Sequence, residues 1–144
     1  MNPGSGILEP KIEVLDAGAM IAFLDDEPGA EVIEVLLLDR DTICIAHAVN
    51  VCEVFYDFYR DHGEEIAQEQ IRRIQDIGVE IRNDMDPAFW QQAGRLKVDP
   101  GGISLADCFL IALTQRVGGE LVTADHHEMD RLVPLNLCPI LFFR

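Results

Sequence analysis

Short apolar runs alternate along this chain with longer segments in which apolar residues recur every three or four positions. The short runs are typical of buried strands, and the periodic segments are typical of helices with one apolar face. The predicted strands are residues 12–15, 42–46, 79–81, 121–123 and 139–143. The predicted helices are residues 17–24, 30–38, 49–61, 64–77, 87–96, 104–117 and 125–132. Strands that alternate with helices indicate an α/β fold around a mainly parallel central sheet.

Residues that favour helix ends mark several of these boundaries. Gly63 and Gly78 follow two predicted helices, and Pro87 occupies the first turn of another. Ser104 is a predicted N-cap. Residues 99–102, with the sequence Asp-Pro-Gly-Gly, are predicted to form a loop.

The length and composition suit one compact domain. The chain has 144 residues, 49% of them hydrophobic, which is enough to bury a single core. No repeat or linker divides it, so we expect a loose leader at residues 1–10 and one domain at residues 11–144. Neither a secretory signal nor an apolar stretch long enough to span a membrane is visible, and we expect a cytoplasmic location.

The cysteines are predicted to be structural. None of the four belongs to a Cys-x-x-Cys pair, and all lie in apolar sequence, which favours buried, reduced thiols over a zinc site or disulfides. They are Cys44, Cys52, Cys108 and Cys138.

Four acidic residues lie where predicted strands end and helices begin. Asp16 and Asp125 follow two strands, Glu53 lies near the start of the helix after another, and Asp107 opens a buried helix. Ligands of parallel α/β sheets bind beyond the carboxyl ends of the strands, so these four side chains can converge. Carboxylates that are gathered together repel one another and are usually held by a divalent cation, and oxygen ligands favour Mg²⁺ or Mn²⁺. Such a cluster suits hydrolysis of phosphodiesters.

A structural interpretation competes with this one. The chain has 26 acidic residues, and an acidic residue at the start of a helix is usually a cap that the helix dipole favours. Asp125 could be such a cap. Asp107 has the stronger functional case, because the residues that follow it are apolar almost throughout.

The formal net charge of −15 argues against a protein that coats nucleic acid, since such proteins bind phosphates through Lys and Arg. It does not exclude an enzyme that meets phosphates through metal ions, and it favours a basic partner.

The four acidic segments, in order and spacing, resemble the acidic motifs of PIN domains, and most closely those of VapC-type ribonuclease toxins from type II toxin–antitoxin pairs. The segments are Leu15-Asp16-Ala17-Gly18-Ala19, Asn50-Val51-Cys52-Glu53, Ser104-Leu105-Ala106-Asp107-Cys108 and Leu121-Val122-Thr123-Ala124-Asp125. The resemblance covers nearly the whole chain from residue 12. It implies a three-layer α/β/α fold, Mg²⁺- or Mn²⁺-dependent endoribonuclease activity, a homodimer and inhibition by a cognate antitoxin.

The same resemblance implies roles for individual residues. Asp16, Glu53 and Asp107 would hold the main metal directly or through water, and Asp125 would assist it or help to bind a second one. Thr123 stands where the family often has a hydroxyl that supports the site. Gly18 departs from the family, which often has Ser or Thr there, so one polar contact to the site is missing.

Three further classes of α/β protein are disfavoured. A receiver domain needs a lysine after the late strand, and the only lysines are Lys11 and Lys97. A haloacid-dehalogenase-type phosphatase usually needs a second Asp where Gly18 stands, and no Gly-x-Gly-x-x-Gly loop for a dinucleotide is present. The alternative from another class is a PIN-like domain that binds RNA or protein without cleaving, which Gly18 and the strong acidity motivate.

Other polar residues have two interpretations each. Asn50 is expected to support the site by capping its helix, with a substrate contact as the weaker option. Arg72 and Arg73 form part of a basic group that either contacts RNA or pairs with nearby acids. His126 and His127 are expected to be exposed polar residues rather than phosphate ligands. His47 is expected to be a half-buried histidine with its hydrogen bonds satisfied.

Four aromatic residues could form a dimer face, and a place in the core is at least as favoured for each of them. They are Phe55, Phe58, Tyr59 and Trp90.

Overall fold

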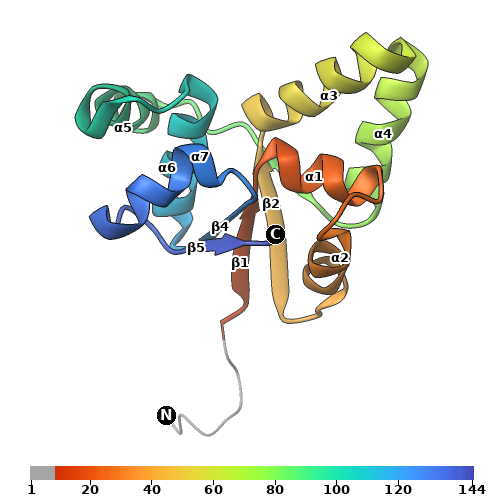
Figure 1. Cartoon of the computed structure of the whole chain (residues 1–144), viewed down its shortest axis with the longest axis horizontal. Helices are drawn as coiled ribbons and strands as arrows, with labels where there is room; N and C mark the ends of the chain where they lie inside the picture. The colour runs from red at the N-terminus through yellow and green to blue at the C-terminus, as the bar shows by residue number, and fades with distance from the viewer. Residues whose placement is uncertain (1–8) are drawn as a thin grey trace, which may run out of the picture.

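A computed structural model describes residues 9–144 and contains one five-stranded sheet (Figure 1). The strands are β1 (Lys11–Leu15), β2 (Thr42–His47), β3 (Glu80–Arg82), β4 (Glu120–Thr123) and β5 (Ile140–Phe142). All neighbours pair in parallel, in the order β3-β2-β1-β4-β5. The prediction of a parallel α/β sheet is confirmed. The predicted leader, residues 1–10, lies outside the described residues except for Glu9 and Pro10.

Helices cover both faces of the sheet and make three layers (Figure 1). The helices are α1 (Ala17–Leu24), α2 (Ala30–Leu38), α3 (Ala48–His62), α4 (Glu64–Asp76), α5 (Pro87–Leu96), α6 (Leu105–Val117) and α7 (His126–Met129). Helices α1 to α4 pack on one face, and α5 to α7 pack on the other. No helix within residues 9–144 has both the length and the apolar character needed to cross a membrane.

The central strand shows why the sheet needs two covering layers. Neighbouring residues of a strand point to opposite faces, and both Val14 and Leu15 of β1 are fully buried. Leu15 packs in the core of the α1 to α4 layer, and Val14 packs with Phe89 and Leu110 in the other core. A strand that is apolar on both faces is typical of a parallel sheet between two helical layers.

One predicted segment agrees with the structure in its irregular backbone, and another differs. Residues 99–102 were predicted to form a loop, and the turn η2 (Lys97–Gly101) is indeed broken at Asp99, which has non-helical dihedral angles, while Gly101 and Gly102 have positive φ. The predicted helix at 125–132 is divided into α7 and a 3-10 segment, η3 (Asp130–Leu135), which contains Pro134. Proline has no N–H to donate, so it does not allow an α-helix to continue through this segment.

The predictions for thiols and aromatic residues hold only in part. Cys44 and Cys108 are buried, but Cys52 is exposed, because it lies on the outer side of α3.

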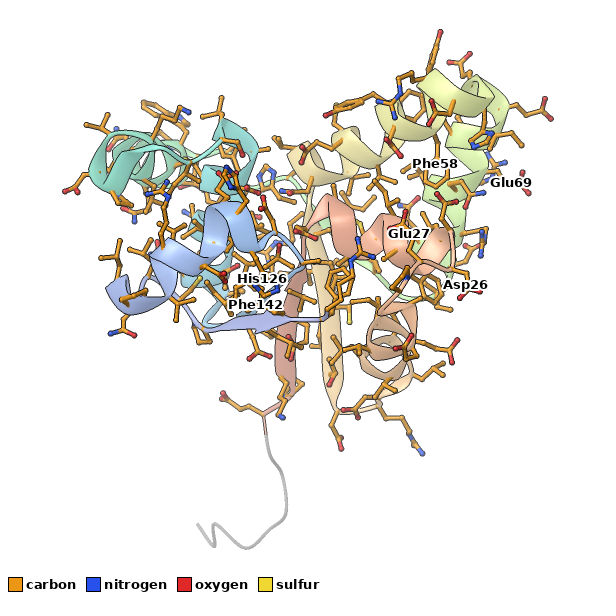
Figure 2. The ribbon with its side chains drawn as sticks, viewed as in Figure 1. Asp26, Glu27, Phe58, Glu69, His126 and Phe142 are labelled. Atoms are coloured by element: carbon orange, nitrogen blue, oxygen red, sulfur yellow. The ribbon has the colours of Figure 1, made fainter. Side chains whose placement is uncertain are left out.

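Phe58 belongs to the core (Figure 2), whereas Tyr59 and Trp90 are about half exposed, at 52% and 47%. Because these two lie on α3 and α5, on opposite layers, the four aromatic residues do not form one continuous face.

A buried acid, Glu13, lies in β1 beside Glu120, the first residue of β4. Glu13 is only 3% exposed, and its register partners are Cys44 on β2 and Glu120 on β4. Its Oε2 atom has no hydrogen-bond partner among the described residues. Burial, and then the neighbouring Glu120 carboxylate, raise the pKa of Glu13 to about 8, while the charge of Lys11 opposes this shift. Glu13 therefore keeps its proton near neutral pH in the folded chain.

The Glu13 carboxyl makes stability depend on pH. Its pKa is raised on folding, so the folded state binds more protons and the free energy of unfolding falls as pH rises from about 4.5 to about 8. We expect Glu13→Gln to reduce this fall by at least about 1 kcal/mol in urea denaturation with EDTA present. The exposed Glu69→Gln variant is the control and should keep the wild-type fall. An unchanged pH dependence in Glu13→Gln would contradict the assignment.

Candidate metal centre

A cavity of about 420 Å³ lies at the edge of the sheet where the strands end. Five carboxylates line it: Asp16, Glu53, Asp107, Asp125 and Glu128. The remaining lining residues are Ala17, Gly18, Asn50, Ser104, Ala124 and Arg144. The structure therefore brings together the four acids that the sequence predicted and adds a fifth.

Asp16 is held rigidly between a strand and a helix. It follows β1 directly, is 8% exposed and caps α1, because its Oδ1 accepts a hydrogen bond of 2.7 Å from the Ala19 N–H. Its own N–H donates to the Val122 carbonyl oxygen at 3.1 Å. The backbone thus points the Asp16 carboxylate into the cavity beyond the strand ends.

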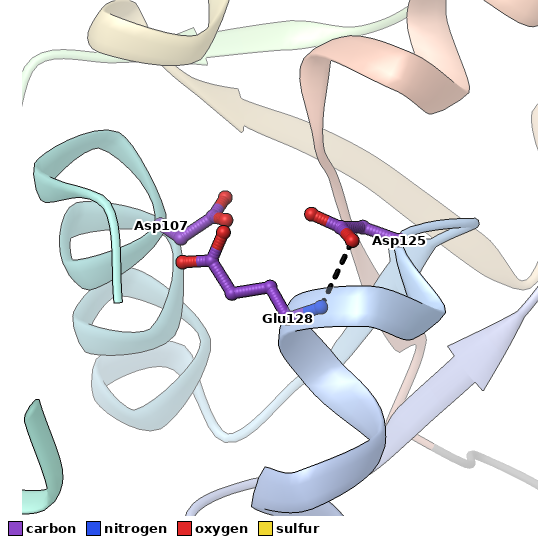
Figure 3. Close-up of side chains that lie close together, drawn as sticks. All are labelled: Asp107, Asp125 and Glu128. Atoms are coloured by element: carbon purple, nitrogen blue, oxygen red, sulfur yellow. Dashed lines mark hydrogen bonds between the residues drawn. The ribbon is translucent and has the colours of Figure 1, made fainter. Parts of the chain in front are cut away.

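Asp125 caps α7 in a similar way. Its Oδ1 accepts from the Glu128 N–H at 3.0 Å (Figure 3), and its N–H donates to Thr123 Oγ1 at 3.0 Å. The buried Thr123 hydroxyl also lies close enough to the Asp16 carboxylate to lower its pKa. Thr123 therefore lies close to two acids of the cavity.

Asp107 enters the cavity from the first turn of α6. Ser104 caps this helix, as predicted, since its Oγ accepts from the Asp107 N–H at 3.2 Å. The Ser104 N–H in turn donates to Glu128 Oε1. This bond ties the start of α6 to α7 and places Glu128 beside Asp107.

Three of the carboxylates form a compact cluster. One oxygen atom from each of Asp107, Asp125 and Glu128 lies within 4.8 Å of the others (Figure 3). Oxygen ligands from several carboxylates suit a hard divalent cation such as Mg²⁺ or Mn²⁺. The chemistry of the donor set therefore fits the cation that the sequence predicted.

Burial and the charges of neighbouring acids raise the pKa values of Asp16, Glu53 and Asp107. Burial raises the pKa of Asp16 to about 6, although bonds from Thr123 and Ala19 oppose the shift. Burial, followed by the charge of Glu128, raises the pKa of Asp107 to about 8. The pKa of Glu53 is raised by burial and then by the charges of Asp16 and Glu128. Protons or a cation must offset this repulsion.

Two cavity residues were missed in the sequence. Glu128 lies three positions after Asp125, one helical turn on, and this spacing was a signal that could have identified it. Arg144 had no such signal, because contacts distant in sequence place it. Its Nη1 donates to the Pro28 carbonyl oxygen at 2.8 Å and to Glu27 Oε1 at 3.4 Å.

Asn50 lies in the cavity wall, but it does not cap its helix. His47 is the N-cap of α3, because its Nδ1 accepts from the Val49 N–H at 3.1 Å, while its Nε2 donates to the Asp84 carbonyl oxygen at 2.8 Å. The capping prediction for Asn50 was therefore wrong. His47, which is 1% exposed, has its hydrogen bonds satisfied, as predicted, although it is more deeply buried than expected.

Histidines 126 and 127 are both exposed and are not among the described lining residues. The His126 ring stacks on Phe142 at 4.2 Å (Figure 2) and bonds Asp130 Oδ1 at 2.9 Å and the Arg144 carbonyl oxygen at 2.8 Å. These contacts agree with the interpretation of His126 as an exposed polar residue.

Arg72 and Arg73 lie on α4 and do not belong to the described cavity wall. Both are exposed, and within residues 9–144 neither forms a salt bridge; Arg73 Nη1 bonds only Gln70 Oε1, at 2.8 Å. Arg60, by contrast, does form a local salt bridge, with Asp61. The interpretation of Arg72 and Arg73 as acid-paired residues is therefore not supported.

Gly18 has room for a β-carbon beside Asp16. A β-carbon built on Gly18 would lie 3.4 Å from Asp16 Oδ1, which is ordinary contact. Space alone therefore does not require glycine at this position.

The family model of the PIN domain matches residues 14–133, which include all five acids of the cavity. The chain belongs to the PIN-domain family. A comparison with curated proteins finds no match.

Solved structures of VapBC and VapC proteins share the fold at low sequence identity. VapBC2 of Rickettsia felis, bound to a promoter DNA fragment, is 14% identical, with a TM-score of 0.71 over 91% of this chain and 98% of the other. VapBC-1 of nontypeable Haemophilus influenzae is 15% identical, with a TM-score of 0.70 over 92% and 98%. VapC20 of Mycobacterium tuberculosis, described as a toxin that cleaves the sarcin–ricin loop, is 13% identical, with a TM-score of 0.62 over 76% and 86%. At these identities the likeness shows the fold.

Proposed function

We propose that this PIN domain is a Mg²⁺- or Mn²⁺-dependent endoribonuclease and the toxin of a toxin–antitoxin pair. The observation that carries the proposal is the convergence of five carboxylates in one cavity at the carboxyl edge of the sheet. Such a concentration of like charge is unfavourable for folding unless a cation offsets it. The structural likeness to VapBC proteins and to VapC20, which is described as a toxin that cleaves the sarcin–ricin loop, supports RNA as the substrate.

The proposed roles follow from the geometry. Asp107, Asp125 and Glu128 hold one cation, since their oxygens already lie within reach of a common centre. Asp16 and Glu53, which line the same cavity, complete that site directly or through water, or contribute to a second. Thr123 keeps Asp16 and Asp125 in place. A bound divalent cation would lower the pKa of a water molecule and neutralise charge on the phosphate.

The partners in this proposal are RNA, a cognate antitoxin and a second copy of the chain in the cytoplasm. The antitoxin is supported by the neighbours solved as VapBC complexes. The homodimer is supported by the family resemblance and by exposed apolar residues such as Val35, at 67%, and Leu38, at 66%. Sedimentation at micromolar concentration tests it, and a clean monomer would remove the dimer from the proposal.

RNA cleavage tests the activity. We expect the wild type to cut RNA with Mg²⁺ or Mn²⁺ and not with EDTA, and Asp16→Asn to lose at least about 100-fold in rate, because a charged ligand becomes neutral. Glu69→Asn, on the exposed surface of α4, is the control and should cut normally. Equal cutting by Asp16→Asn would indicate a contaminating nuclease. If the wild type does not cut RNA and calorimetry detects no Mn²⁺ binding, the result would favour a PIN-like domain that binds RNA or protein without cleaving.

Arg72 and Arg73 are proposed to contact RNA away from the cavity. Charge reversal in Arg72→Glu/Arg73→Glu should weaken RNA cleavage by about 3- to 30-fold through loss of phosphate contacts, most strongly at low salt, without changing the unfolding temperature. Arg95→Glu is a matched control, because Arg95 is also exposed and bonds only a glutamine, Gln92 Oε1 at 3.2 Å. Unchanged cleavage by the double variant would exclude this contact.

A further inference from the structure

Asn50 is an unusual residue for the wall of this cavity. It lies in the first turn of α3, three positions before Glu53, and its side chain is fully buried at 0% exposure. Neither its Nδ2 nor its Oδ1 atom has a hydrogen-bond partner among the described residues. Buried polar groups are nearly always paired, so an unpaired amide that lines a cavity indicates a group that the cavity receives.

The Asn50 amide has no structural role in the hydrogen bonds of the surrounding residues. His47 already caps α3, and the Thr123 hydroxyl already serves Asp16 and Asp125. An Asn side chain here therefore does not hold the helix end or orient a neighbouring carboxylate through a hydrogen bond.

The chemistry of the cavity indicates which half of the amide matters. Its five carboxylates supply acceptor oxygens and repel an incoming phosphodiester. The other side-chain donors of the wall are Arg144 and Ser104. Arg144 Nη1 donates to Pro28 and Glu27, and the Ser104 hydroxyl accepts from the Asp107 N–H and keeps its own O–H to donate. The Asn50 NH₂ group is the buried side-chain donor of the described wall that has nothing to donate to.

We propose that Asn50 donates a hydrogen bond from Nδ2 to a non-bridging oxygen of the scissile phosphodiester. This inference rests on the proposed ribonuclease function and extends it to a residue that binds substrate rather than metal. A neutral donor suits this place, because it binds an anionic oxygen without competing with the cation for the carboxylates.

Two nearly isosteric variants separate the possible roles of Asn50. Asn50→Leu removes both donor and acceptor, and Asn50→Asp replaces the donor with a second acceptor oxygen and adds a negative charge. We expect both to lower kcat/KM for RNA cleavage by about 10- to 100-fold, the effect of one hydrogen bond to a charged group. Asn50→Leu should unfold at the same temperature as the wild type or higher, because two unpaired buried atoms are gone. Its Mn²⁺ affinity in calorimetry should stay within about 3-fold of the wild type.

Each contrary result has a distinct meaning. Wild-type cleavage by Asn50→Asp would assign the role to the acceptor and overturn the proposal. Full cleavage by Asn50→Leu would overturn it too, while leaving the ribonuclease function intact. A lower unfolding temperature or a weakened Mn²⁺ affinity in Asn50→Leu would place the effect in the fold or in the carboxylate cluster, against the proposal. Absence of RNA cleavage by the wild type would instead reject the proposed function on which this contact depends.

Discussion

The repulsion among carboxylates at one edge of the sheet is the constraint on which the candidate site depends. Five acids share a single cavity, and burial adds to their repulsion by removing water from around Asp16 and Asp107. The pKa values of both acids are raised, so the folded chain without a cation holds protons on them to a higher pH than it would on a free aspartate. A divalent cation would relieve the repulsion by supplying positive charge, so cation binding and proton release are expected to be coupled.

The same acids also help to build the fold, which explains how such a cluster is held in place. Asp16 and Asp125 cap α1 and α7, and Ser104 caps α6 beside Asp107. The unpaired N–H groups at these helix starts favour negative charge. The interpretation of the acids as caps and their interpretation as metal ligands are therefore compatible, because each capping aspartate retains a second carboxylate oxygen.

Asn50 and Glu13 show two different outcomes for a buried polar group without a partner. Glu13 lies between Cys44 and Glu120 in the sheet, where retention of its proton lowers the cost of burial. Asn50 cannot change its charge, and it lies in the wall of the cavity that the five carboxylates line. The first is a feature of stability, whereas the second indicates a ligand.

The sequence by itself determined the alternation of strands and helices, most of their boundaries and the four acids at strand ends. These follow from local periodicity, from capping residues such as Ser104 and from the rule that parallel strands end at one edge. Glu128 was within reach of the same reasoning, through its spacing from Asp125. The same reasoning does not find the capping of α3 by His47. Its Nδ1 accepts from the nearby Val49 N–H, but its Nε2 bonds the Asp84 carbonyl oxygen, which is 37 positions away in the sequence. Tertiary structure alone decided that Arg144 reaches the cavity and that Asn50 is buried there without a partner, since burial and pairing depend on neighbours that only the folded chain brings together.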